Sequence, residues 1–438
     1  MSSNTFNDLY ALIDTLPVIS SHEHHMPDAF HQDLTLDRVL ENSYIGWYAG
    51  RTEKSKDKLK NVDSQISISQ RPKIYLLPSI DPNTTSKDLA KQRSDFLDRH
   101  SYNSYLVWLD KGLQRIYGYE GDLNPENWDW ISKKITEKHQ EPNAHIEILK
   151  NSGKYLHAVQ DTYWDYGNNL GHPELFSPTM RVDMFVSSCH PTVLDHDRNS
   201  PFIRYPDAPT NNFDDYLDFI KKLFTSWREK GAVAMKSASA YERTIRYSEG
   251  NRQIAECVFY KPSQDVNWED RIAYGDFMFN WFCKLSVELD IPFQIHTGLA
   301  ELSGSRPMLF EPMIARYPGA RFVLFHSGYP WYSDIIGLAH NYDNICIDMV
   351  WAPIISTSGA INALHQYIEV AQSSDLIGWG GDTWTSEEAV GAMLAWQFVI
   401  ASVLTVKIED GYLDWKKAEV LAHKLMYRNN AKIYGFSL

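Results

Sequence analysis

The segment PVISSHEHH, residues 17–25, joins a short apolar run to a group of histidines. In an extended strand successive side chains point to opposite faces, so His22 and His24 share one face while Glu23 points the other way. Two imidazoles side by side on one face can bind one metal ion. Because a His-x-His triplet also occurs by chance, its meaning depends on what the other strands contribute.

Strands and helices alternate through most of the chain after this first strand. Apolar runs predict seven more strands, at residues 154–160, 181–187, 232–236, 291–296, 321–326, 344–348 and 376–382. Apolar residues at helical spacing predict helices at residues 7–16, 131–150, 212–230, 274–289, 307–317, 333–342 and 360–372. Apolar strands that alternate with helices are typical of a parallel sheet, and eight of them indicate an α/β fold closed into a (β/α)8 TIM barrel.

Residues from about 27 to 129 interrupt this alternation. They contain the Lys-rich run at residues 51–58 and helical, aromatic-rich segments such as residues 94–117. We therefore expect a single barrel domain, residues 1–438, with a large and mostly helical insertion after the first strand. The insertion could form a lid or a contact in a homo-oligomer, and its charged run is most simply a solvated face.

Composition limits the classes of function. The 438 residues are 43% hydrophobic and 22% charged, which is typical of a folded globular protein, and the net charge of −14 argues against nucleic acid as a partner. The four cysteines show no Cys-x-x-Cys spacing and are expected to be reduced thiols. The first residues do not form a signal peptide, and we expect no apolar segment long enough to cross a bilayer. These features favour a cytoplasmic protein that acts on a small molecule.

Polar side chains recur where the predicted strands end. Barrel enzymes place their chemistry at the carboxyl ends of the strands. A single His or Asp there often only caps a helix, but a set of metal-compatible side chains at one mouth indicates a site. The set consists of His22, His24, Lys236, His296, His326 and Asp382.

The order of these residues resembles that of the amidohydrolase superfamily of metal-dependent TIM barrels. The segments at residues 235–243, 294–298, 325–330 and 429–435 are most similar to its amidohydrolase 2 branch, which includes uronate-isomerase-like proteins and an amidohydrolase-like domain fused to glutamine synthetase. Two departures stand out. Ser20 occupies a position where many members have Asp, and the long interval between Lys236 and His296 implies an insertion between strands four and five.

This resemblance implies a divalent ion held by His22, His24 and Asp382, with His296 as a further ligand. Asp382 would also take the proton from an attacking water and pass it to the leaving group. Imidazole and carboxylate ligands suit zinc, and manganese or iron would also fit.

The number of ions depends on Lys236. If Lys236 is carbamylated it would bridge two metals, and His296 and His326 would bind the second ion. Otherwise Lys236 is a substrate-binding cation or a buried ion-pair partner. His326 would then donate a hydrogen bond to the substrate carbonyl as charge develops on its oxygen.

Three further side chains are candidates for substrate binding. Tyr241 and Arg243 follow the predicted fourth strand and could clamp a carboxylate, although a salt bridge on a barrel loop explains Arg243 equally well. Trp384 could form a wall of the pocket or pack in the core. The expected activity is hydrolysis of a C–N or ester bond in a small molecule, and a carboxylated molecule is one option. The alternatives are aldose–ketose isomerisation of a uronate, metal-dependent decarboxylation, and a non-enzymatic scaffold.

Overall fold

Eight parallel strands form the centre of the computed structural model, which describes residues 4–47 and 86–438. The strands pair in chain order from β1 to β8. Backbone hydrogen bonds from Ser21 to Trp379 and from Asp382 to His22, both 2.9 Å long, join the last strand to the first. The predicted (β/α)8 barrel is confirmed, with strands β1 Val18–Glu23, β2 Tyr155–Gln160, β3 Phe176–Arg181, β4 Ala234–Ser237, β5 Phe293–Ile295, β6 Phe322–Leu324, β7 Ile345–Asp348 and β8 Ile377–Gly378.

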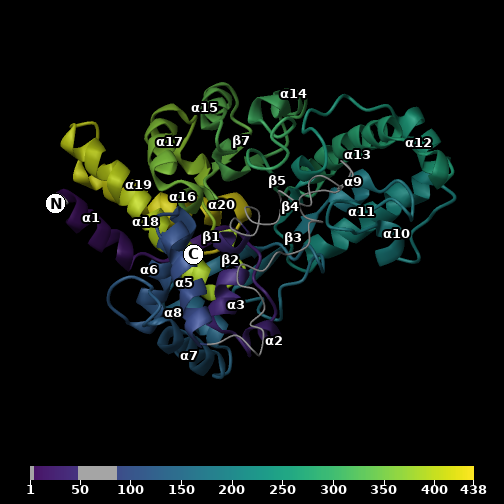
Figure 1. Cartoon of the computed structure of the whole chain (residues 1–438). Coiled ribbons are helices and arrows are strands. Elements are labelled where there is room, and N and C mark those ends of the chain that lie inside the picture. Colours follow the sequence, from purple (N-terminus) through teal and green to yellow (C-terminus); the bar gives the residue numbers. More distant parts are fainter. Residues whose placement is uncertain (1–3, 48–85) are drawn as a thin grey trace.

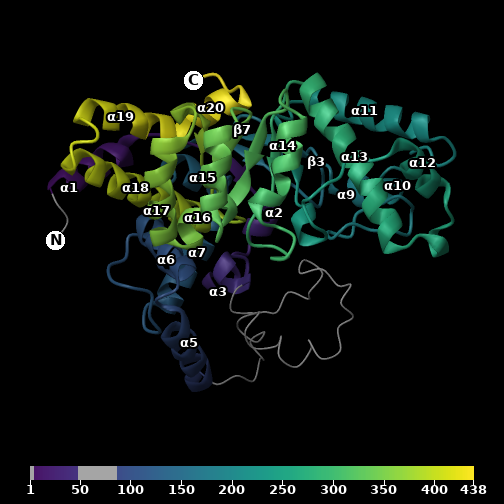
Figure 2. The same ribbon diagram turned by 90° about the horizontal axis from the view of Figure 1, so that it is seen from above.

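Helices surround this barrel and form two groups beside it (Figure 1). In both views α10 to α13 lie at the opposite end of the molecule from α1, α18 and α19 (Figure 2). The helices outside the insertion are α1 Asn4–Thr15, α8 Ala144–Asn151, α9 Asp183–Ser187, α10 Pro201–Arg204, α11 Phe213–Glu229, α12 Arg252–Tyr260, α13 Trp268–Glu288, α14 Glu311–Arg316, α15 Tyr332–Asn341, α16 Ala352–Ile355, α17 Thr357–Val370, α18 Ser386–Glu409, α19 Trp415–His423 and α20 Asn429–Tyr434.

The third strand was predicted wrongly. Residues 181–187 were expected to form it, but the strand is Phe176–Arg181 and the apolar run that follows is helix α9, Asp183–Ser187. Every residue of α9 is buried, and a short run that is apolar on all sides does not distinguish a strand from a buried helix. Pro178, which weakens the appearance of a strand because it lacks an N–H, lies within β3.

The insertion after β1 is helical where it is described, and it has a hydrophobic core of its own. Its helices are α2 Asp28–His31, α3 Leu36–Glu41, α5 Ser86–His100, α6 Ser104–Tyr117 and α7 Trp128–His139. Their core includes Val39, Leu113, Trp128 and Ile131, all fully buried. The Lys-rich run at residues 51–58 lies outside the described residues.

Four buried histidines join the insertion and α8 to the barrel. His31 of α2 stacks on His145 of α8, with ring centroids 3.8 Å apart, and His25 and His139 lie next to this pair. His139 Nε2 is 2.7 Å from Glu387 Oε1, at the start of α18. Burial lowers the pKa of His25 to about 3 and that of His31 to about 4, so these rings are neutral at pH 7. We call His25, His31, His139 and His145 the histidine cluster.

Helix α18 differs from the expectation that no segment could cross a membrane. With a mean hydropathy of 1.9 it is long and apolar enough to do so by length and composition, but 83% of its most apolar window is buried inside the fold. Its partners explain this composition. Helix α6 packs against it at Gly112, where a Cβ would lie 2.7 Å from the backbone nitrogen of Gly391. The apolar surface of α18 therefore belongs to the protein core.

Candidate active site

Gln294 fixes the orientation of His22. The amide nitrogen of Gln294 donates to the Ser21 carbonyl and to the Tyr434 hydroxyl, each at 2.9 Å. Its oxygen therefore faces His22 Nδ1, at 3.1 Å, and that nitrogen must carry the proton of the neutral ring. The other ring nitrogen, Nε2, is left as a lone pair. It is buried and has no hydrogen-bond partner among the described residues.

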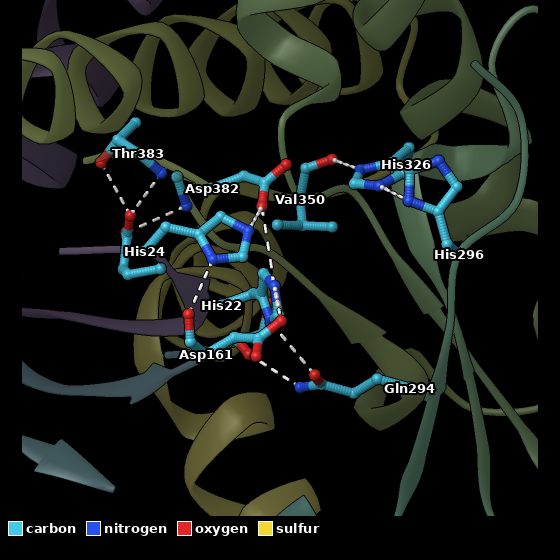
Figure 3. Close-up of polar contacts among 12 residues, drawn as sticks. His22, His24, Asp161, Gln294, His296, His326, Val350, Asp382 and Thr383 are labelled. Carbon is cyan, nitrogen blue, oxygen red and sulfur yellow. Dashed lines mark hydrogen bonds and ion pairs between the residues drawn. The ribbon is translucent and has the colours of Figure 1, made fainter. Parts of the chain in front are cut away.

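His22, His24 and Asp382 point toward one another at the mouth of the barrel (Figure 3). His24 Nδ1 donates to the Asp161 carbonyl at 2.8 Å, which turns His24 Nε2 toward Asp382 Oδ1, 3.2 Å away. His22 Nε2 lies 3.6 Å from the same oxygen and 3.5 Å from Asp161 Oδ2. The ligand atoms of His22, His24 and Asp382 all lie within 4.8 Å of one another. Two imidazoles and a carboxylate in this arrangement fit a divalent metal ion.

The charges at this group also fit a cation. Burial, the Lys236 ammonium and His24 lower the pKa of His22 well below its usual value, so its lone pair faces two carboxylates without a proton. Burial alone would lower the pKa of His24, but its hydrogen bond with Asp382 and the charges of Asp382 and Asp161 together outweigh burial and raise it. Burial would likewise raise the pKa of Asp382, and the hydrogen bond with His24 and the neighbouring histidine charges hold it well below its usual range. A metal ion bound here would replace the proton of His24.

Glu23 supports the group from the opposite face of β1. Its carboxylate accepts hydrogen bonds from Ser20, from the Tyr155 hydroxyl, from the Gly381 backbone and from both the backbone and the hydroxyl of Thr383. Ser20, which departs from the residue common in the amidohydrolases, thus supports the site through Glu23. These contacts connect the strand that carries both histidines to the segment that carries Asp382.

Gly380 and Gly381 allow this close approach. A Cβ on Gly380 would lie 2.6 Å from the His22 backbone nitrogen, and a Cβ on Gly381 would lie 2.6 Å from Glu23 Oε1. Asp382 itself has a φ of 64°, in the left-handed region that residues other than glycine rarely adopt. Backbone strain of this kind is concentrated at functional sites.

His296 and His326 form a separate pair beside this group. His296 Nε2 faces the Leu299 carbonyl at 3.0 Å, and His326 Nδ1 faces the Val350 carbonyl at 3.2 Å. The remaining nitrogens, His296 Nδ1 and His326 Nε2, are 3.0 Å apart. If both outer nitrogens donate to their carbonyls, two lone pairs face each other, so the pair needs an additional proton or a bound cation. Neither nitrogen of His296 lies in the group formed by His22, His24 and Asp382.

Trp384, which was predicted as a pocket wall, and Tyr241, which was predicted as part of a carboxylate clamp, both lie beside site histidines. The Trp384 ring stacks on His24, with ring centroids 5.3 Å apart, and contacts Tyr44. The Tyr241 ring lies 4.5 Å from that of His296. Both side chains are therefore next to predicted site histidines.

Arg243 is used differently from the predicted carboxylate clamp. Its guanidinium donates to Asp276 Oδ1 at 2.5 Å and to the carbonyls of Thr244 and Ile272. Its plane also lies over the Tyr247 ring, 4.4 Å from the centroid. With these contacts made, Arg243 is a buried structural ion-pair partner, which was the alternative interpretation.

Tyr44, Glu388 and Asp161 were missed from the sequence. Tyr44 follows α3 in the insertion, and its hydroxyl donates to Asp382 Oδ2 at 2.5 Å. Its backbone nitrogen donates to Glu388 Oε1 at 2.7 Å, so a residue of α18 holds the insertion in place. No periodicity could have placed Tyr44 there. Asp161 directly follows β2, and the strand-end rule that found the other residues would have found it as well.

Residues 263–436 match the family model described as amidohydrolase. This match covers less than half of the chain, and it shows a likeness to the amidohydrolases over the C-terminal part. Protein fluG from Emericella nidulans is 28% identical to this chain over 149 residues, which are 33% of this chain. The match spans 17% of the length of fluG.

Three solved structures share the fold of this protein. A glucuronate isomerase from Caulobacter crescentus is 18% identical, with a TM-score of 0.73 over 99% of this chain and 94% of that one. A uronate isomerase from Thermotoga maritima is 15% identical, with a TM-score of 0.73 over 99% and 98%. A protein named as a metal-dependent hydrolase, from Lactobacillus casei, is 15% identical, with a TM-score of 0.64 over 98% and 97%. At these identities the likeness shows the fold.

Proposed function

We propose that this protein is a metal-dependent hydrolase that cleaves a C–N or ester bond in a small molecule. The observation that carries the proposal is the convergence of His22 Nε2, His24 Nε2 and Asp382 Oδ1 within 4.8 Å of one another. These three side chains would hold the ion, and zinc suits them best. A bound ion supplies a Lewis acid that brings the pKa of a water ligand toward neutrality and polarises a carbonyl.

Asp382 moves the proton in this mechanism. Its Oδ1 faces the two histidines, while its Oδ2 accepts the hydrogen bond from Tyr44. Asp382 takes a proton from the attacking water and gives it to the leaving nitrogen or oxygen, which makes it the general base and then the general acid. Tyr44 keeps the carboxylate in one orientation, so that the oxygen facing the histidines does not rotate away.

His326 has one of two roles beside Asp382. In the first role, His326 Nε2 would turn its proton away from His296 Nδ1 and donate it in a hydrogen bond to the substrate carbonyl oxygen as that oxygen becomes negative. With Lys236 carbamylated, the two facing nitrogens of the pair would instead suit a second ion. The metal content of the protein distinguishes these roles.

A second candidate is isomerisation of a uronate. The fold likeness to the two uronate isomerases extends over 99% of this chain and so includes the insertion that supplies Tyr44. In that reaction the same ion would polarise the sugar carbonyl while Asp382 moved a proton between neighbouring carbons. The identity of the reaction therefore depends on the substrate and not on the metal ligands.

Elemental analysis and a substrate screen test the proposal. We expect one equivalent of a divalent ion per chain, and turnover of a member of a panel of N-acyl amino acids and lactones. Turnover of D-glucuronate or D-galacturonate would favour the isomerase instead. Asp382→Asn should abolish turnover without changing the far-ultraviolet circular dichroism spectrum. Asp334→Asn, which removes a buried carboxylate that pairs with Arg306 away from the site, is the matched control. A protein without metal, or full activity of Asp382→Asn, would contradict the proposal.

A further inference from the structure

The buried cations of this protein are paired with carboxylates, with one exception. Five Lys or Arg side chains are buried among the described residues. A buried charge without a partner is costly, so an ion pair is the usual arrangement. Arg93 pairs with Asp129 at 2.8 Å, and Lys407 pairs with Glu369 at 2.6 Å. Arg243 and Arg181 are also paired, the first with Asp276 and the second with Asp161, Asp183 and Asp197.

Lys236 is the exception. Among the described residues, no carboxylate oxygen lies within the 4.0 Å ion-pair distance of its Nζ. Lys236 Nζ contacts the face of the Phe325 ring and lies 3.7 Å from the ring centroid. The carboxylates of Asp382 and Asp161 act on it only from beyond ion-pair distance. An aromatic face stabilises a cation much less than a carboxylate does.

The position of Lys236 places this unpaired ammonium beside the candidate metal group. The edge of the same Phe325 ring contacts His22, with ring centroids 4.8 Å apart. In the barrel, Lys236 is paired in register with Gln294 of β5, whose amide orients His22, and with Arg181 of β3, which holds Asp161. The ammonium therefore belongs to the layer of side chains that supports the candidate ligands.

We propose that Lys236 binds a carboxylate of the substrate at the edge of the metal group, so that this protein selects anionic molecules. The proposal rests on the proposed function and names its substrate class. A carboxylate there would give Lys236 the ion pair that every other buried cation among the described residues already has. The molecule would then be held at two points, by Lys236 and by the metal. Burial lowers the pKa of Lys236 to about 7, and a bound carboxylate would raise it.

Calorimetric titration of the metal-loaded protein tests this proposal. The probes are acetate, succinate and D-glucuronate, each compared with its neutral counterpart, acetamide, succinamide or D-glucose. We expect at least one carboxylate to bind more tightly than its counterpart. Lys236→Gln and Lys236→Met should weaken that binding about 10- to 100-fold, because a hydrogen bond assisted by charge is lost. Lys236→Arg should retain part of it.

The matched control is Lys407→Gln, which removes a buried lysine that already has a carboxylate partner. It should leave carboxylate binding unchanged. Lys236→Gln should fold with an undiminished melting temperature, because it removes a buried charge that has no partner. If none of the three carboxylates binds in preference, or if Lys236→Gln binds them as wild type does, the proposal is wrong.

Two measurements on the same samples separate this proposal from the proposed function. Carboxylate binding that depends on Lys236 in a protein without metal would leave this proposal standing while the hydrolase proposal failed. If metal content and turnover are normal but carboxylate binding does not depend on Lys236, the hydrolase proposal stands and the proposal for Lys236 fails. A carbamate signal on Lys236 after growth with ¹³C-bicarbonate would also overturn the proposal, since the nitrogen would then have no ammonium to offer.

Discussion

Lowering the pH should loosen the contact between the insertion and the barrel through the histidine cluster. Burial lowers the pKa of His31 from 6.5 to about 4 in the folded protein. The unfolded chain therefore takes up the proton first, and the stability that His31 contributes is complete above pH 6.5 and is lost as the pH falls toward 4. Such a shift corresponds to about 3 kcal/mol in full, of which roughly 2 kcal/mol is lost between pH 7 and pH 5.

Wild-type protein alone cannot isolate this effect, because other buried groups act in the opposite direction. Burial raises the pKa of Asp348 to about 7 and that of Glu388 to about 8, so these carboxyls take up protons in the folded state over the same pH range and stabilise it. The comparison is therefore with His31→Phe, which keeps an aromatic ring against His145 but does not titrate. Both proteins retain Asp348 and Glu388.

The assay is urea unfolding at pH 7, 6 and 5, followed by circular dichroism. The free energy of unfolding of wild type should fall by roughly 2 kcal/mol more than that of His31→Phe between pH 7 and pH 5. His190→Asn, a change at a half-buried histidine outside the cluster, should show the wild-type dependence. Equal pH dependence in wild type and His31→Phe would refute the reasoning, since it would mean that His31 is not held neutral by burial.

Three further substitutions test contacts at the site. Tyr44→Phe should lower kcat about tenfold with little change in melting temperature, because it removes the hydrogen bond to Asp382, and steady-state kinetics would reject this role if kcat were unchanged. Glu23→Gln should lower the free energy of unfolding by about 3 kcal/mol, because the new NH₂ group would face backbone and hydroxyl donors, and an unchanged urea midpoint would count against it. Arg243→Met should lower the melting temperature but leave KM unaltered, because Arg243 pairs with Asp276 inside the fold. A raised KM would instead mean that Arg243 contacts the substrate.

The sequence predicted which residues lie at strand ends because that position depends on local periodicity. His22, His24 and Asp382 were found in this way, although they lie at opposite ends of the chain, since a closed parallel barrel brings all strand ends to one rim. Asp161 satisfies the same rule and was overlooked. The prediction of the third strand failed because the neighbouring helix α9 is buried on every side, and this hid Arg181 as a strand-end residue.

Partners within the rim were not predictable, because periodicity does not say which side chains meet. Arg243 follows the fourth strand, where a substrate-binding residue would lie, but it forms an ion pair with Asp276 of α13. Tyr44 reaches Asp382 from an insertion whose placement depends on its own core and on Glu388. The sequence around Lys236 does not indicate that this side chain lacks a carboxylate partner. Only the positions of all the neighbouring acidic side chains reveal it.

The seam between β8 and β1 has a consequence for biosynthesis. Glu23 and the backbone of β1 bind the segment at Gly381 and Thr383, so the metal group is completed by two parts of the chain that leave the ribosome far apart in time. A nascent chain that already displays His22 and His24 has no Asp382 to offer and no closed rim. Any metal ion that this group binds could therefore be held only after the eighth strand has emerged, and shortened products that end before it should contain no ion at this position.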